Sequence, residues 1–177
     1  SEKMDAGPIL AQKEMEISQK ETFASLHNKL VELGAELLIE TLPKLLAGKA
    51  PPLPQDETKV TYTKILKKGN GKIDWRKSAE KIERQIRAFD SWPGNFTFWE
   101  KSGILIRIKI LKARVLNRAD LKTYPIGKTL VAGQNELCVQ TGKGFLIIEK
   151  LQLEGKKEID SEEFIRGRSD FIGTILK

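Results

Sequence analysis

The chain has 177 residues, of which 40% are hydrophobic and 7% aromatic, a composition typical of a folded globular protein and not of a disordered tail. No apolar run approaches the roughly 18 residues of a membrane span, and the first residues lack the apolar core of a secretion signal. The single cysteine, Cys138, excludes an internal disulfide framework and is expected to be a small buried side chain. We therefore expect a reducing compartment and no membrane partner.

Positive charge is concentrated in one short stretch. The formal net charge is +7, and nine basic but only three acidic residues lie between Lys64 and Arg87. The stretch therefore holds an excess of six positive charges, whereas the first 63 residues carry a net charge of −3. This uneven distribution predicts a polyanionic partner for the middle of the chain. A solvated helix face with scattered charge is the alternative.

The amino-terminal part predicts one strand and one helix. Residues 8–17 have the pattern of a strand that begins buried and then alternates. Ser18 and Glu21 form a Ser-x-x-Glu pattern, which predicts the start of a helix. Pro43 should end or bend this helix, and Gly48 should stop it. Its apolar stripe, at three- and four-residue spacing, consists of Phe23, Leu26, Leu30, Leu33 and Leu37. A strand and a helix of this size are typical of the last unit of an open α/β sheet.

The next segment predicts an extended connection and a second, shorter helix. Three prolines in four positions open residues 51–70, which favours a semi-rigid linker. Ser78 has the character of a helix N-cap. The inward stripe of the helix that it begins is expected to consist of Ala79, Ile82, Ile86 and Phe89.

From Asn95 onward the apolar residues follow the period of β-strands. The first strand has one buried face, formed by Ile104, Ile106, Ile108 and Ile110. Further strands are predicted around residues 127–131, 136–141 and 145–153. Thr141–Gly144 should join the last two as a hairpin, and Asp160 with Glu163 should cap a brief closing helix. Short strands with glycine-rich turns predict a small barrel or sandwich.

A series of short motifs resembles the C-terminal part of the methionyl-tRNA formyltransferase family, and the resemblance runs essentially from end to end. The motifs are Met4–Leu10, Leu26–Leu30, Leu33–Ala35, Thr61-Tyr62, Ile73–Trp75, Ile86–Phe89, Trp92–Gly94, Thr141–Gly144, Leu151-Gln152 and Gly155–Lys157. Each motif alone is weak evidence. Their order and spacing together carry the resemblance.

The resemblance implies an α/β part followed by an all-β part. Residues 1–50 would be the tail of a Rossmann-like formyltransferase domain, residues 51–70 a linker, and residues 71–177 an OB-like β-barrel with a short flanking helix. Such enzymes move a formyl group from 10-formyltetrahydrofolate to the amino group of methionyl initiator tRNA. The family's active-site Asn and His belong upstream of the matched residues, so we expect this stretch of chain to be inactive alone.

Within the resemblance, Asp5 matches the family's catalytic aspartate, and Met4 and Asp5 lie at the edge of the folate site. Formyl transfer requires an amine to lose a proton while a tetrahedral oxyanion forms and collapses. An aspartate near a histidine can hold that histidine in its useful protonation state and help to carry the proton through water. Without the resemblance, an Asp in a turn before a glycine, here Gly7, is usually a turn-former.

The basic stretch supplies the predicted tRNA contacts, which are Lys64, Lys67, Lys68 and Lys72 first and then Arg76, Arg84 and Arg87. Each cation that reaches a phosphate displaces condensed counterions, so the affinity should fall steeply with salt. Arg87 has an alternative structural interpretation, in which it pairs with Asp74 or Asp90.

Other residues have two interpretations. Trp75 and Trp92 could stack on bases or clamp the short helix onto the barrel. A second basic set, Arg107, Lys109, Lys112 and Arg114, could extend the phosphate track or be an ordinary exposed face. His27 is expected to be structural, and no group of residues has metal-ligand spacing, so we expect no metal.

Two other functions compete with the first. One is a formyltransferase that acts on a nucleotide-linked amino sugar, and the other is an RNA-binding module without chemistry. For the preferred function we expect a monomer in the bacterial cytoplasm or an organellar matrix.

Overall fold

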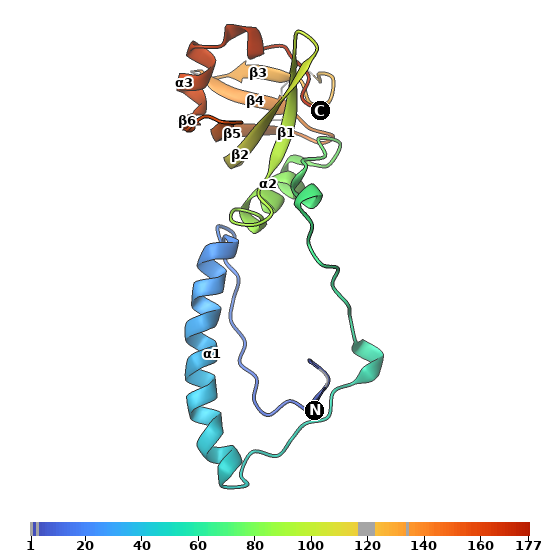
Figure 1. Ribbon diagram of the computed structural model, residues 1–177, viewed down its shortest axis with the longest axis vertical. Coiled ribbons are helices and arrows are strands. Elements are labelled where there is room, and N and C mark those ends of the chain that lie inside the picture. Colours follow the sequence, from blue (N-terminus) through green and yellow to red (C-terminus); the bar gives the residue numbers. More distant parts are fainter. Residues whose placement is uncertain (1, 3, 117–122, 134) are drawn as a thin grey trace. The chain divides into compact units, whose positions relative to one another are not determined.

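The computed structural model describes residues 2, 4–116, 123–133 and 135–177, and Figure 1 labels their helices and strands. The chain divides into two compact units, Ser1–Ile65 and Leu66–Lys177. The division falls inside the predicted linker, residues 51–70.

The first unit is dominated by one long helix, α1 (Phe23–Leu46), and also holds the short 3-10 helix η1 (Glu57–Lys59). The N-cap of the helix is Thr22, four residues after Ser18, and its capping box is formed by Thr22 and Ser25, so the predicted Ser18–Glu21 box is wrong. The hydroxyl of Thr22 accepts a hydrogen bond from the Ser25 N–H at 3.2 Å, and the Ser25 hydroxyl accepts one from the Thr22 N–H at 3.0 Å.

Glu21 has a different role at this helix start. Its carboxylate accepts hydrogen bonds from the Ser18 and Ser25 hydroxyls and forms an ion pair with Lys29 at 2.8 Å. The hydrogen bond from Lys29 and then the one from Ser25 lower the pKa of Glu21 to about 2. Glu21 therefore ties the segment before α1 to the helix.

The end of α1 agrees in part with the prediction. Gly48 adopts a φ of 67° and donates its N–H to the Leu45 carbonyl at 3.0 Å, which confirms the predicted stop. Pro43 does not end the helix, which continues to Leu46. A proline in the last turn removes only one backbone hydrogen bond there, so the remaining turn is retained.

The predicted strand at residues 8–17 is wrong. Only Ile9 pairs with another segment, through two backbone hydrogen bonds of 2.8 and 2.9 Å with Leu53. A strand needs a neighbour along its length to satisfy its backbone groups, and the described part of the chain provides none. For the same reason α1 has no buried residue and its apolar stripe stays exposed or half-exposed. No helix among the described residues is long and apolar enough to span a membrane.

The second unit is built on one curled antiparallel sheet, an OB-like half-barrel (Figure 1). Its strands are β1 (Phe96–Lys101), β2 (Ile104–Leu116), β3 (Thr129–Ala132), β4 (Glu136–Gln140), β5 (Phe145–Leu153) and β6 (Glu158–Asp160). The order is β1-β2-β5-β4-β3, and β6 pairs with β5. The predicted strands from residue 104 onward and the hairpin between β4 and β5 are confirmed. Strands β1 and β6 were not among the predicted strands.

Helices and aromatic side chains close the core of this unit. Helix α2 (Ala79–Ala88) is capped by the Ser78 hydroxyl and buries Ala79, Ile82 and Ile86, as predicted. Phe89, which was expected on the same stripe, is the C-cap residue and is half-buried. Helix α3 (Ser161–Arg166) is also present, but the Asp160 side chain makes no capping hydrogen bond, so that part of the prediction is wrong. Trp99 packs edge-on against Phe171 with ring centroids 5.1 Å apart. Burial of each such side chain stabilises the unit by roughly 1.5–3 kcal/mol.

A bulge in β2 decides which side chains face outward. The pairing with β5 shifts between Ile110 and Ala113, so the inward positions change from 108 and 110 to 113 and 115. As a result the four basic residues of this strand, at 107, 109, 112 and 114, lie on the outer face, as the sequence indicated. Ile104 is exposed at the hairpin end, so the predicted buried face is shorter than expected.

Candidate functional site

Two glycines fix the basic segment to the barrel. A Cβ on Gly142 would lie 1.8 Å from the Arg76 carbonyl oxygen, so only glycine allows this approach. The Gly142 N–H donates to the Trp75 and Lys77 carbonyls at 2.8 and 3.1 Å. A Cβ on Gly71 would likewise lie 1.8 Å from the Gly94 carbonyl oxygen. These two glycines are therefore positions of close backbone contact.

The two tryptophans of the recognised motifs have different roles. Trp75 is 4% exposed and donates its indole N–H to the Thr97 hydroxyl at 2.9 Å, which confirms its structural interpretation. Trp92 is 56% exposed, so its ring is accessible for stacking on a base. Motifs that are distant in sequence thus meet at one place and anchor the basic segment.

The four lysines predicted to contact tRNA first, Lys64, Lys67, Lys68 and Lys72, are all exposed. None of them forms an ion pair with a described residue. The backbone at this place is ordered by Asn70, whose side-chain oxygen accepts the Lys67 N–H at 2.6 Å at the start of η2 (Lys68–Gly71). These cations are available to an external anion.

The three predicted arginine contacts differ in their pairing. Arg76 holds Asp74 in a bidentate pair of 2.8 and 3.0 Å, yet its side chain is 80% exposed. This hydrogen bond also lowers the pKa of Asp74. Arg87 pairs with Glu83 at 2.6 and 3.2 Å and is mostly buried, so the described ion pair of this arginine is with Glu83, whereas Asp74 or Asp90 was expected. Arg84 is exposed.

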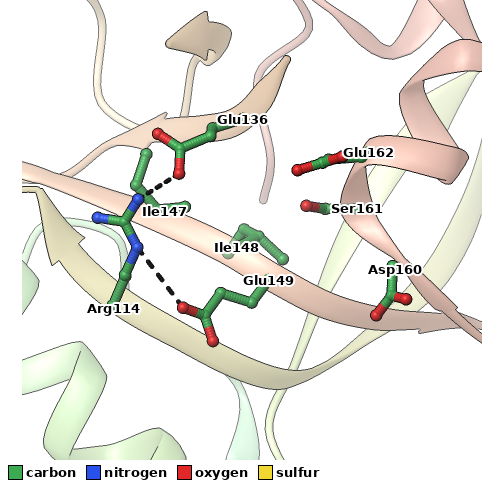
Figure 2. A pocket seen from close by; sticks show the side chains of 8 residues that line it. All are labelled: Arg114, Glu136, Ile147, Ile148, Glu149, Asp160, Ser161 and Glu162. Atoms are coloured by element: carbon green, nitrogen blue, oxygen red, sulfur yellow. Dashed lines mark hydrogen bonds and ion pairs between the residues drawn. The ribbon is translucent and has the colours of Figure 1, made fainter. Parts of the chain in front are cut away.

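The second basic set on β2 is divided in two. Lys112 pairs with Glu149 at 2.9 Å, and Arg114 lies between Glu136 and Glu149 (Figure 2). Arg114 borders a cavity of about 340 Å³ whose wall also includes Asp160 and Glu162. In the other half, the Arg107 guanidinium stacks 3.8 Å above the Phe96 ring.

The predicted catalytic residue lies on an exposed turn of the first unit. Asp5 has a φ of 60°, and the carbonyls of Asp5 and Gly7 both accept hydrogen bonds from the Gln55 side-chain amide, at 2.9 and 2.6 Å. Met4 is 90% exposed. Among the described residues the Asp5 carboxylate has no partner. The turn therefore presents this carboxylate outward, held by a residue that the sequence analysis did not identify.

The remaining titratable candidates are structural. His27 lies against Phe23, with ring centroids 5.7 Å apart. Burial raises the pKa of the Cys138 thiol to about 12, so it is not a nucleophile at neutral pH. The described residues include no group of three or more His, Cys, Asp or Glu side chains that could hold a metal ion.

The fold and the exposed cations define a small OB-like domain with a strongly basic entry segment. Residues 65–169 match the family described as formyl transferase, C-terminal domain. The chain belongs to this family.

Curated relatives extend the match over nearly the whole chain. A methionyl-tRNA formyltransferase of Lachnospira eligens is 38% identical over 99% of this chain and 55% of its own length. The one of Roseiflexus castenholzii is 39% identical over 93% of this chain and 51% of its own length. The chain thus spans about half the length of the curated relatives that it matches.

Solved structures share the fold at lower identity. HypX from Aquifex aeolicus in complex with tetrahydrofolic acid has a TM-score of 0.63 and 22% identity, and the match covers 97% of this chain and 29% of HypX. An N-formyltransferase from Helicobacter canadensis, in complex with folinic acid and dTDP-3-aminofucose, has a TM-score of 0.59 and 19% identity, with coverages of 82% and 51%.

Proposed function

We propose that this chain is the C-terminal portion of a methionyl-tRNA formyltransferase. The whole enzyme would move a formyl group from 10-formyltetrahydrofolate to the amino group of methionyl initiator tRNA. The observation that carries the proposal is the similarity to enzymes of that name over 93–99% of this chain. We further propose that it acts as a monomer in the bacterial cytoplasm or an organellar matrix.

In this proposal residues 1–50 are the tail of a Rossmann-like catalytic domain. Two observations support it: residues 8–17 have a strand pattern but no paired strand, and the apolar face of α1 is exposed. The rest of a sheet would pair with this segment and cover this face. The Asp5 carboxylate, which has no partner in the described part of the chain, fits a group that acts on substrate, and Met4 beside it fits the edge of the folate site.

The donor supplies an activated formyl group, and the acceptor amine must lose a proton as it takes that group. Asp5 would hold a neighbouring base in its useful protonation state and help this proton to leave through water. Gln55 would keep the turn in place through its two hydrogen bonds to backbone carbonyls.

The second unit, together with the basic residues that precede it from Lys64 onward, would bind the tRNA. The support for this is the row of exposed lysines without described acidic partners, of which Lys67, Lys68 and Lys72 lie in the second unit. Lys64, Lys67, Lys68 and Lys72 would contact backbone phosphates, and Arg76 and Arg84 would add to them. The charge of Arg87 is already paired with Glu83, so Arg87 would support tRNA binding indirectly, by helping to hold α2 in position.

Formylation assays with the full-length enzyme test the proposal. Methionyl initiator tRNA should be formylated in preference to a nucleotide-linked amino sugar. The opposite preference would establish the amino-sugar enzyme. That alternative has weaker support, because the identity to the Helicobacter canadensis protein is 19%, whereas the identity to the Lachnospira eligens methionyl-tRNA formyltransferase is 38%. RNA binding without either activity would indicate a binding module.

A further inference from the structure

The outer face of β1 carries two aromatic side chains that contribute to neither described core cluster. Phe96 and Phe98 pack edge to face with ring centroids 5.6 Å apart. Phe96 is nevertheless only 7% exposed. Each ring has a cation–π contact. The Lys72 ammonium lies 5.5 Å from the Phe98 centroid, and the Arg107 guanidinium lies 3.8 Å from the Phe96 centroid. Direct contacts therefore connect Lys72, the last of the four exposed lysines, with Arg107 on β2.

Arg107 is a partly buried cation without an acidic partner. It forms no ion pair with a described carboxylate, and its Nε is buried without a hydrogen-bond acceptor. Arg114, on the same outer face, differs in this respect because Glu136 and Glu149 neutralise it (Figure 2). An unpaired buried donor costs free energy unless an acceptor arrives. Stacking on Phe96 holds the guanidinium plane in place for such an acceptor.

A pocket adjoins this guanidinium. Its volume is about 200 Å³, and it is lined by Arg107, Lys109, Gln152, Leu153, Glu154 and Gly155. The turn between β5 and β6 closes it: the Glu154 N–H donates to the Arg107 carbonyl at 3.0 Å, and the Gln152 amide donates to the Lys156 carbonyl at 2.8 Å. Two cations and one carboxylate line the pocket, so its net charge is positive.

We propose that this pocket binds a backbone phosphate of a nucleic acid, as a second contact beyond the lysines of the basic segment. A guanidinium edge gives a phosphate two parallel hydrogen bonds, and Lys109 adds a second charge. A polyanion is the appropriate ligand because the Lys72–Phe98–Phe96–Arg107 contacts continue the row of exposed lysines into the pocket. The inference rests on the proposed function for one point only, that this nucleic acid is tRNA.

Equilibrium binding of initiator tRNA by the 177-residue chain, at several salt concentrations, tests the contact. Arg107→Gln should weaken binding about tenfold at low salt and reduce the slope of log K against log salt by about 0.7 to 0.9. Lys109→Gln should have a smaller effect in the same direction. Arg114→Gln is the matched control and should leave the slope unchanged, because two glutamates already compensate Arg114. Equal slopes for Arg107→Gln and the unsubstituted chain would overturn the proposal.

A second measurement does not depend on tRNA binding or on the folding of a variant. The Nε–H resonance of Arg107 should shift saturably when inorganic phosphate or pyrophosphate is added to the unsubstituted chain, while that of Arg114 stays in place. A resonance of Arg107 that does not respond would contradict the pocket. If the chain fails to bind tRNA but Arg107 responds to phosphate, the proposed function loses its support while the phosphate site stands.

Discussion

The two units of this chain differ in what they bury. In the second unit, Leu66–Lys177, a sheet and two helices enclose a core that includes Trp99, Ile82 and Phe171. In the first unit, Ser1–Ile65, the described residues bury no large apolar side chain, and the buried side chain that stands out is the carboxylate of Glu21. The second unit therefore carries its own stability, whereas the first leaves the apolar face of α1 and the turn at Asp5 exposed.

The largest expected effect is on turnover and comes from a substitution in the first unit. Asp5→Asn in the full-length enzyme should lower turnover by about 10²–10⁴-fold, because the amide cannot take part in proton transfer. Asparagine tolerates the positive φ of this position, so the turn is retained. Single-turnover formylation measures the loss, and tRNA affinity should stay the same. Glu14→Gln, at another exposed carboxylate of this unit, is the control, and near-normal turnover of Asp5→Asn would remove the catalytic assignment.

Affinity should instead depend on the basic segment. Replacing Lys64, Lys67, Lys68 and Lys72 together by Gln should weaken tRNA binding about a hundredfold at low salt and reduce the salt slope by about 3. The matched control removes the same charge from four lysines that are already ion-paired, Lys101, Lys112, Lys150 and Lys177. Filter binding at several salt concentrations compares the two. A similar loss in both variants would mean that net charge, and not position, determines binding.

Glycine substitutions sharpen the comparison of packing. Gly142→Ala should destabilise the second unit by about 3 kcal/mol, since its Cβ would meet the Arg76 backbone. Gly34→Ala, in α1, meets no atom within 4 Å and should stabilise the helix by up to about 1 kcal/mol. Denaturant unfolding with separate probes for the sheet and the helix measures both. Equal effects of the two substitutions would contradict the contrast between the units.

The smallest effect expected is a pH dependence of the start of α1. The pKa of Glu21 is lowered from 4.5 to about 2 in the folded chain, chiefly by the hydrogen bond from Lys29. Its contribution to stability is therefore present above pH 4.5 and is lost as the pH falls toward 2. Glu21→Gln should reduce helicity at pH 7 and match the unsubstituted chain near pH 2. Circular dichroism across this range checks it, and a difference that persists at pH 2 would assign the effect to side-chain shape.

Sequence patterns predicted the local elements of the second unit well. The helix after Ser78, the strands β4 and β5 and the hairpin between them follow from capping, alternation and glycine-rich turns, which act between near neighbours. The strand predicted at residues 8–17 failed because pairing partners, and not its own pattern, decide whether a strand forms. The Ser18–Glu21 box failed because a competing box, Thr22 with Ser25, lies four residues later.

The candidate site divides in the same way. The sequence indicated the row of basic residues and the resemblance indicated Asp5, but neither indicated which cations are paired. The Arg87–Glu83 pair has a signal that was missed, since Glu and Arg four residues apart on a helix face each other. A signal for strand β1 was missed as well, because Phe96 and Phe98 alternate with Thr97 and Trp99 as residues of a β-strand do.

By itself, the sequence determined the charge excess between Lys64 and Arg87, the short helix and the hairpin, because composition and local periodicity are properties of adjacent residues. The three-dimensional fold was needed to show that Arg114 is neutralised, whereas Arg107 has no acidic partner among the described residues. The glutamates that pair with Arg114 come from β4 and β5, and the ring beneath Arg107 comes from β1. Pairing across strands depends on register, and the bulge in β2 sets that register where no local pattern shows it.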